Sequence, residues 1–262
     1  MGLTYLKLKL NYGRNILMKT NPVLSIIIPV FNEEKNIPLV AEKFSESLKN
    51  QNVEILLVED SGSTDNTREE IKKVMKKYPF IKGVFINERG YGKSIFEGLN
   101  SAKGEFLCWT HADMQTDPSD TIKALEIIQK QKNPEKSYVK GNRHRRPFFD
   151  KFFEFGMSIF ESAILGTYLY DINAQPNLFH KSLLNLMKNP PTDFSFDLYV
   201  YYLAKKSKYK IVRFPVLFPK RIHGESKWNS GDFKSKYKFI KRTIKFSLGL
   251  KKILRRGKNV NN

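Results

Sequence analysis

The sequence predicts an α/β protein with three layers, in which helices cover both faces of a mostly parallel central sheet. Two observations support this fold. Four short apolar runs in residues 24–110 have the length and β-branched content of buried strands. A helical pattern follows each run, and this alternation is typical of parallel sheets. A chain of 262 residues is long enough for one large domain with appended segments.

The first two strands are expected at residues 24–30 and 53–60, where "LSIIIPV" and "VEILLVED" are largely apolar. Apolar residues at helical spacing follow the first strand. After the second strand, Thr67 and Glu70 have the spacing of a capping box, which predicts the start of a helix.

The third and fourth strands are expected at residues 81–87 and 104–110. A glycine-bearing turn and a helix over residues 93–102 separate them. Asp117 is the expected N-cap of the next helix, with Pro118 in its first turn.

The second half of the chain is less regular. It should contain aromatic-rich helices at 149–170 and 194–206, a strand at 209–218, a polar loop at 219–232 and a final helix from 232 onward. No segment has the uninterrupted apolar length of a membrane span. We therefore divide the chain into an N-terminal extension (1–22), a main domain (23–228) and a basic amphipathic C-terminal helix or tail (229–262).

Positive charge is concentrated near the C-terminus. The net charge is +20, and residues 220–262 hold 14 Lys and Arg against 2 Asp and Glu, a net +12. Such a block favours an anionic partner, and a solvated tail is the simpler alternative. We expect no nucleic-acid partner, because no nucleic-acid motif is present. The single cysteine, Cys108, excludes an intramolecular disulfide and, with no secretory signal expected, fits a reducing cytoplasm.

Polar residues follow each of the four expected strands. Because ligands of parallel sheets bind outside the carboxyl ends of the strands, these residues should face one crevice. After the fourth strand, His111, Asp113 and Gln115 alternate along "HADMQ". If the chain is extended there, the three side chains point to one side and could hold a cation.

Eight segments, in sequence order, resemble the motifs of family 2 glycosyltransferases. The first four, "SIIIPVFNEEKNI", "EILLVEDSGSTDNT", "GYGKSIFEGLNSAKGEF" and "HADMQTDP", are similar to the family as a whole. The later "GNRH", "DINAQPNLFHK", "FSFDLYV" and "RIHGESKW" are similar to the dolichol- and polyprenyl-phosphate sugar transferases. The resemblance covers about residues 24–228. It implies the GT-A fold, a Rossmann-like sandwich, and an inverting sugar transfer from a nucleotide-diphosphate sugar.

The resemblance also implies a divalent cation, Mn²⁺ or Mg²⁺, that neutralises the departing diphosphate. Its implied ligands are His111, Asp113 and Gln115, since hard cations prefer oxygen donors. The family motif has aspartate where this chain has His111. Imidazole suits Mn²⁺ better than Mg²⁺, so His111 either shifts the metal preference, lies outside the ligand set or weakens the site. A histidine that only packs is the plain alternative.

The implied nucleotide-sugar site lies across the ends of the first two strands. Asp60 is expected to accept a hydrogen bond from the base, but "EDSG" allows two registers, so Glu59 competes with it. Both carboxylates could instead cap the following helix. The glycine turn "GYGK" could approach the diphosphate, although such turns are common. The residues implied to bind the nucleotide sugar are Pro29, Phe31, Glu33, Glu59, Asp60, Gly90, Lys93, Ala112 and Asp113.

The catalytic groups that the reaction needs depend on the chemical class of the acceptor. A sugar hydroxyl needs a general base, and Asp197 matches the base position of many family members. A polyprenyl (dolichyl or undecaprenyl) phosphate is already anionic and needs cations instead. The cations implied by the resemblance are Arg143, Lys151, Arg221 and Lys227, of which Lys151 stands in an ambiguous register; surface charges are the plain alternative. The residues expected to take part in catalysis are Asp113, Asp197, Arg221 and Lys227.

We therefore expect a glycosyltransferase that acts on a polyprenyl phosphate at a membrane surface. The basic tail and the aromatic helix after Phe148 would dock it on the cytoplasmic face of an anionic membrane as a peripheral protein. An amphipathic helix packed on its own core is the alternative explanation of the tail. Two other functions stay open: transfer to a hydroxyl of a lipid-linked glycan or polysaccharide, and non-catalytic nucleotide-sugar binding with a degraded metal site.

Overall fold

The computed structural model describes residues 21–48, 51–144, 148–219, 237, 241 and 244–251. In this part of the chain a seven-stranded sheet has the strand order β3-β2-β1-β4-β6-β5-β7. β6 is antiparallel to both of its neighbours, and the other pairs are parallel. The mostly parallel sheet expected from the sequence is therefore confirmed. The strands are β1 (Leu24–Val30), β2 (Val53–Asp60), β3 (Ile81–Ile86), β4 (Phe106–Trp109), β5 (Ser137–His144), β6 (Asn177–His180) and β7 (Lys210–Leu217).

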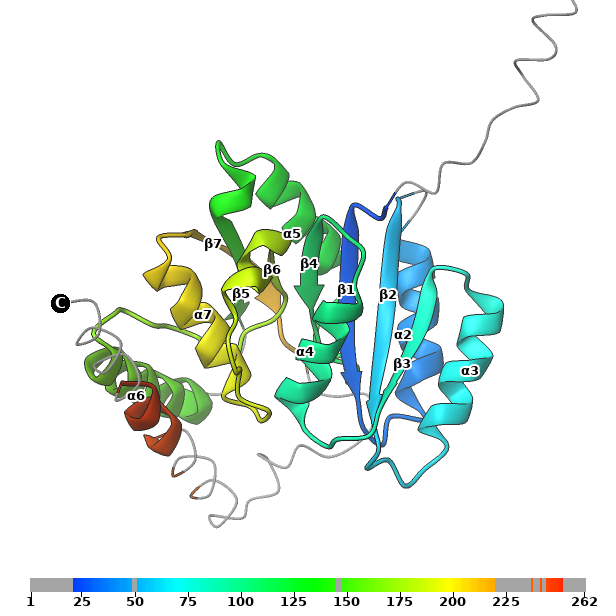
Figure 1. Ribbon diagram of the computed structural model, residues 1–262, viewed down its shortest axis with the longest axis horizontal. Coiled ribbons are helices and arrows are strands. Elements are labelled where there is room, and N and C mark those ends of the chain that lie inside the picture. Colours follow the sequence, from blue (N-terminus) through cyan, green and yellow to red (C-terminus); the bar gives the residue numbers. More distant parts are fainter. Residues whose placement is uncertain are drawn as a thin grey trace, which may run out of the picture.

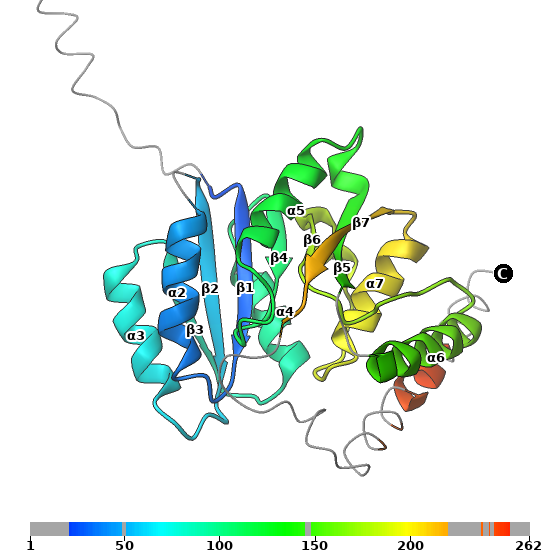
Figure 2. The same ribbon diagram turned by 180° about the vertical axis from the view of Figure 1, so that it is seen from behind.

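Helices cover both faces of the sheet. Figures 1 and 2 show α4 and α7 on one face and α2, α3 and α5 on the other. The helix α6 lies beside the sheet, next to the helical C-terminal segment at residues 244–251. The helices are α2 (Asn36–Ser47), α3 (Thr67–Lys77), α4 (Tyr91–Ser101), α5 (Ser119–Gln129), α6 (Phe148–Leu165) and α7 (Phe196–Lys206), with short 3₁₀ helices η1 (Pro134–Lys136) and η2 (Lys181–Leu186).

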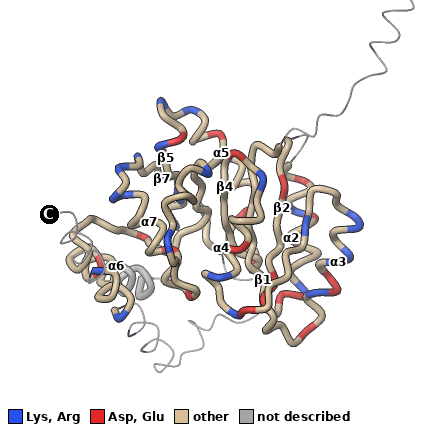
Figure 3. Tube along the Cα trace, in the orientation of Figure 1, with Lys and Arg blue, Asp and Glu red and all other residues tan. Residues whose placement is uncertain are grey.

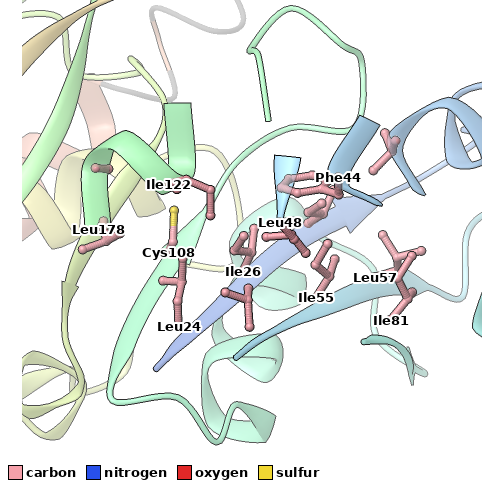
Figure 4. Packing of buried hydrophobic residues seen from close by; sticks show 14 of the residues in the cluster. Leu24, Ile26, Phe44, Leu48, Ile55, Leu57, Ile81, Cys108, Ile122 and Leu178 are labelled. Carbon is pink, nitrogen blue, oxygen red and sulfur yellow. The ribbon is translucent and has the colours of Figure 1, made fainter. Parts of the chain in front are cut away.

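Alternation along the buried strands produces two apolar cores. Leu24 and Ile26 of β1 point to the face of α2, α3 and α5, together with Ile55 of β2 (Figure 4). Ile27 of β1 points to the opposite core, against α4 and α7. Gly98 brings α4 close to the sheet, because a Cβ there would lie 2.5 Å from Ile27. Both faces being buried explains why β1 and β2 are continuous apolar runs.

The sequence missed β5 and β6. In β5, Lys140, Gly141 and Asn142 interrupt the apolar pattern, and β6 has only four residues. The capping box expected at Thr67 and Glu70 is wrong, because Thr67 is already the first helical residue. The N-cap is Asn66, and the side chain that accepts a hydrogen bond from the Thr67 amide, at 3.1 Å, is that of the preceding Asp65.

The remaining helix boundaries agree with expectation to within a few residues. The N-cap expected at Asp117 is wrong by one residue, because α5 begins at Ser119 with Pro118 at the N-cap, although Asp117 Oδ1 accepts from the Ser119 amide at 2.8 Å. The aromatic helix is shorter than expected, because the chain leaves it at Gly166 with φ +63°. Most of the polar loop expected at 219–232 lies outside the described residues.

Candidate active site

The carboxyl ends of β1, β2, β3 and β4 lie at one edge of the sheet, at the bottom of Figure 1. Figure 3 shows both acidic and basic residues along this edge. The loops that follow β1 and β2 are braced together. Asn32, with φ 55°, accepts a hydrogen bond from the Thr64 amide at 2.8 Å, and the Glu33 amide donates to Thr67 Oγ1 at 2.8 Å. These hydrogen bonds therefore hold the two loops together at the carboxyl ends of the strands.

The side chains of Asp60 and Glu59 point to opposite faces of the sheet. Asp60 accepts hydrogen bonds from the amides of Gly62 (3.0 Å) and Gly90 (3.1 Å), so it joins the end of β2 to the glycine turn before α4. Glu59 points to the other face, where its Oε2 accepts from Arg68 Nε at 2.6 Å. Neighbouring residues of a strand point in opposite directions, and only Asp60 faces the glycine turn.

An arginine that the sequence analysis overlooked lies beside Phe31. The guanidinium of Arg89 is 4.6 Å from the centre of the Phe31 ring, an arrangement that attracts a cation to an aromatic face. Gly62 leaves room for this pair, since a Cβ there would lie 3.0 Å from both side chains. Arg89 directly precedes the glycine turn "GYGK", but its ring partner is distant in sequence. Phe31, Asp60 and Arg89 thus form one cluster at the strand ends.

Other residues expected to bind the nucleotide sugar make contacts within the protein. Glu33 Oε2 accepts from Asn36 Nδ2 at 2.6 Å, at the start of α2. The Lys93 ammonium lies 3.2 Å from carboxylate oxygens of Glu88 and Glu97. The hydrogen bond to Glu88, followed by that to Glu97, raises the pKa of Lys93. Pro29 is the penultimate residue of β1, and Ala112 is buried in the loop after β4.

The loop after β4 is bent, so the expected alternation of His111, Asp113 and Gln115 along an extended chain is wrong. β4 ends at Trp109, and Met114 adopts a left-handed conformation with φ 58°. The Asp113 carboxylate accepts from the Gln115 amide at 3.2 Å, and Gln115 Nε2 donates to the Pro219 carbonyl at 3.0 Å. Asp113 lies at the strand edge with His111 beside it in the chain.

The donor set of this loop fits a cation that also binds a substrate. Within the described residues, no group of three or more His, Cys, Asp and Glu side chains could hold a metal alone. Asp113 does supply a carboxylate at the edge where ligands of parallel sheets bind. Mg²⁺ is commonly held by one or two carboxylates together with substrate phosphates, so a single carboxylate and an incoming diphosphate are a suitable set.

Asp197 lies in a buried polar network behind this loop. It is 2% exposed, and its Oδ1 accepts from Trp109 Nε1 at 3.0 Å, Gln175 Nε2 at 2.9 Å and Asn177 Nδ2 at 3.4 Å. Gln175 Nε2 also donates to the Tyr91 hydroxyl at 3.3 Å. The network therefore connects α7, β4, β6 and the start of α4.

Tyr91 joins this network to the loop after β4. Its ring is stacked on Phe194 at 4.5 Å and lies 5.8 Å from the His111 ring. Burial, followed by the charges of Asp197 and Asp113, holds the pKa of Tyr91 well above its usual value, so its hydroxyl is protonated at neutral pH.

The expected acceptor cations are only partly described. Arg143 forms an ion pair with Asp171: its Nε donates to Oδ1 at 2.8 Å, and its amide donates to Oδ2 at 2.9 Å. Lys151 lies on α6, but its side chain is outside the described part. Arg221 and Lys227 lie outside the described residues altogether. The roles of all four stay predictions.

Comparison with known proteins agrees with the motifs. Residues 25–183 match the model of glycosyl transferase family 2. A dolichol-phosphate mannosyltransferase of Pyrococcus furiosus is 28% identical over 210 residues, which cover 78% of this chain and 58% of that protein. An undecaprenyl-phosphate 4-deoxy-4-formamido-L-arabinose transferase of Aeromonas hydrophila is 24% identical over 214 residues, covering 79% and 63%. The chain thus spans about three fifths of the length of these relatives.

Solved structures show a similar fold. Glucosyl-3-phosphoglycerate synthase from Mycobacterium tuberculosis, in complex with Mn²⁺, UDP-glucose and phosphoglyceric acid, superimposes with a TM-score of 0.67 at 15% identity. The match covers 89% of this chain and 80% of that protein. At this identity the similarity concerns the fold, and it confirms the expected GT-A architecture.

Proposed function

Because this chain belongs to glycosyl transferase family 2, we propose that it transfers a sugar, with inversion, from a nucleoside-diphosphate donor to a polyprenyl phosphate at a membrane surface. The observation that carries the proposal is the arrangement of Phe31, Asp60, Arg89 and Asp113 at the carboxyl ends of adjacent parallel strands. The relatives named for transfer to dolichol phosphate and undecaprenyl phosphate support the class of acceptor.

The donor would lie across the ends of β1 and β2. Phe31 and Arg89 offer a flat surface for a base, and Asp60 offers carboxylate oxygens to its N–H groups. The diphosphate would then reach Asp113, where a divalent cation held with His111 and Gln115 would supply neutralising charge for the leaving group. The protein's own part is to fix the donor so that its anomeric carbon faces the acceptor.

The chemical step needs no proton transfer when the acceptor is a phosphate monoester. An acceptor oxygen forms a bond to the anomeric carbon while the bond to the nucleoside diphosphate breaks, and the electron pair leaves on the diphosphate oxygen. Attack opposite the leaving group inverts the configuration. Arg143 is the described cation that could orient the acceptor phosphate, since its guanidinium is already held by Asp171.

The contacts of Asp197 favour a phosphate acceptor over a hydroxyl acceptor. A general base must lie within hydrogen-bond reach of the proton it removes. Asp197 is 2% exposed, and one of its oxygens already accepts three hydrogen bonds. A phosphate acceptor avoids this requirement, because it brings its own negative charge.

The membrane surface is supported by the apolar side chains on α6. Phe155 is 56% exposed and Ile159 is 55% exposed, one helical turn apart. Leu248, in the neighbouring C-terminal helix, is 53% exposed. In both views α6 lies beyond α7 along the long axis, in the lower half of the picture, where the carboxyl ends of β1 and β2 also lie (Figures 1 and 2). Among the described residues, no helix combines the length and apolar character needed to cross a bilayer.

A panel of nucleotide sugars tests the function. Each donor is incubated with undecaprenyl phosphate, dolichyl phosphate or a free polyprenol, in Mg²⁺ or Mn²⁺. We expect a mild-acid-labile glycosyl phospholipid with one of the phosphates, no product with the polyprenol, and loss of at least a hundredfold in Asp113→Asn. Product on a hydroxyl acceptor alone would support the alternative enzyme, and donor binding without transfer would support a non-catalytic homologue.

Flotation with liposomes tests the docking surface. The full chain should float with vesicles that contain anionic lipid, and the double substitution Phe155→Ser with Ile159→Ser should reduce the bound fraction several-fold. The matched control is Phe85→Ser, at an exposed phenylalanine on β3, the opposite edge of the sheet. Equal flotation of all three proteins would contradict docking through α6.

A further inference from the structure

Lys140 is a fully buried lysine that the proposed reaction does not use. It lies in β5 with 0% exposure, and its ammonium donates to the Ala174 carbonyl at 2.7 Å and to Asn177 Oδ1 at 2.7 Å. Both acceptors are neutral. Lysine is rarely buried this completely unless a partner or a function holds it there.

Asn177 connects Lys140 to Asp197 through hydrogen bonds. Its Oδ1 accepts from both Tyr138 Oη (2.9 Å) and Lys140 Nζ (2.7 Å), so the amide group has one orientation. Its Nδ2 then donates to Gln175 Oε1 at 2.7 Å and to Asp197 Oδ1 at 3.4 Å. A rotated amide would place two donors next to the ammonium and an oxygen next to the carboxylate.

From Asp197 the chain of contacts reaches the loop after β4. Asp197 holds Trp109, the last residue of β4, two residues before His111. Gln175 holds both Asp197 and Tyr91, and Tyr91 lies against His111. The ammonium is therefore at one end of a continuous path of hydrogen bonds and ring contacts whose other end is the proposed diphosphate site.

We propose that Lys140 is a positioning residue for sugar transfer: its ammonium orients Asn177 together with the Tyr138 hydroxyl and places a positive charge near Asp197, and thereby fixes Asp197, Trp109 and Tyr91 beside the loop that carries His111 and Asp113. This inference rests on the proposed function. It assigns to Lys140 a role in the precision of the site, because small displacements of reacting groups reduce the rate strongly.

The fold itself does not need this ammonium. The Ala174 carbonyl also accepts from Asn177 Nδ2 at 3.1 Å, and Asn177 Oδ1 also accepts from Tyr138. Removing the amine therefore leaves each acceptor with a second donor. A buried charge that the fold can lose without exposing an unpaired group is better explained by its effect on Asp197 than by its contribution to stability.

The protonation of Lys140 changes near neutral pH, so its coupling to the network can be followed by a pH titration. Burial lowers its pKa to about 7. The charges that face it come from every neighbouring element: Asp197 on α7 and Asp171 in the loop before β6 raise the pKa, whereas Arg213 on β7 and Arg143 on β5 lower it. Two tyrosines are also near: the Tyr201 ring centre lies 5.6 Å from the ammonium, and the Tyr138 hydroxyl donates to the same Asn177 oxygen.

The indole N–H of Trp109 reports on this path, because it donates directly to Asp197. The sequence has two tryptophans, so an ¹H–¹⁵N spectrum should show two indole signals, and Trp109→Phe identifies the relevant one. We expect this signal to shift with a midpoint near pH 7 in the wild type and in Lys136→Met, which removes an exposed lysine just before β5. The shift should disappear in Lys140→Met.

Activity is measured on the same variants. Lys140→Met should keep a thermal midpoint at least as high as that of the wild type. Its KM for the donor should stay within threefold of the wild-type value, while its kcat should fall at least tenfold. Lys136→Met should leave the thermal midpoint, KM and kcat unchanged. An unchanged kcat in Lys140→Met would overturn the proposal. So would an invariant Trp109 signal in the wild type, a measurement that needs no variant of Lys140 to fold.

A titration that vanishes in His111→Gln but persists in Lys140→Met would assign the proton to the imidazole and also overturn it. A wild type that transfers no sugar would instead refute the proposed function, and the Trp109 titration would still decide whether Lys140 is coupled to Asp197.

Discussion

Replacing Lys140 by methionine should make the protein more stable, and the gain should depend on pH. The pKa of this lysine is about 7 in the fold against 10.5 in a model peptide. Each unit corresponds to about 1.4 kcal/mol, so burying the charged form costs about 5 kcal/mol. Because the folded pKa is depressed, the folded state binds fewer protons than the unfolded state between pH 7 and 10.5, and stability rises with pH across this window.

Methionine has nearly the same length as lysine and carries no charge. The substitution loses two hydrogen bonds of about 1 kcal/mol each, while Ala174 and Asn177 keep their other donors. At pH 6 the net gain is therefore about 3 kcal/mol. At pH 9 the remaining cost in the wild type is about 2 kcal/mol, so the two proteins should be almost equally stable.

Urea denaturation of both proteins at pH 6, 7.5 and 9 measures this difference. Other titrating groups are common to the two chains and cancel in the comparison. Equal slopes against urea would show that both proteins expose the same surface on unfolding. A variant less stable than the wild type at pH 6, or a difference that does not change with pH, would refute the reasoning.

Three further predictions concern other parts of the molecule. Arg89→Ala should weaken binding of a nucleoside diphosphate about five- to tenfold in calorimetric titration, because it removes the cation over Phe31. Glu161 is buried on α6 beside Ser247, and burial raises its pKa from 4.5 to about 7. The stability of the wild type against unfolding should therefore fall as the pH rises from 4.5 to 7, because the folded state must then bury a charged carboxylate. Glu161→Gln should be up to about 3 kcal/mol more stable than the wild type in urea at pH 8. Burial raises the pKa of the Cys108 thiol, so an aromatic disulfide reagent should label it only after unfolding.

The sequence was sufficient for the elements whose burial depends on their own residues. β1 and β2 were placed to the residue, because parallel strands covered on both faces are continuous apolar runs. β5 could not be found in this way. Its burial includes Lys140, whose hydrogen-bond partners Ala174 and Asn177 come from a distant part of the chain. No local pattern indicates that a lysine will find such partners.

Some features of the candidate site could likewise be predicted from the sequence, and others could not. The carboxyl ends of the strands, and hence the neighbourhood of Asp60 and Asp113, followed from the alternation of strands and helices. Which of Asp60 and Glu59 faces the glycine turn could be seen only in the three-dimensional structure, and the role of Asp60 in binding a base stays a prediction. The line of donors expected after β4 failed because Met114 adopts a left-handed conformation that the motif does not reveal.

The buried network and the phosphate acceptor are consistent with each other. A site that used Asp197 as a base would have to expose one of its oxygens to substrate and let it gain a proton in every turnover. Here Trp109, Gln175 and Asn177 all donate to one oxygen of Asp197, which ties this carboxylate to β4, to β6 and to the loop before β6. A carboxylate held in this way is suited to fixing the position of β4 and Tyr91. A phosphate nucleophile is already ionised, so it needs no base, and the positioning role of Asp197 is sufficient. A neutral hydroxyl would need a second, exposed base.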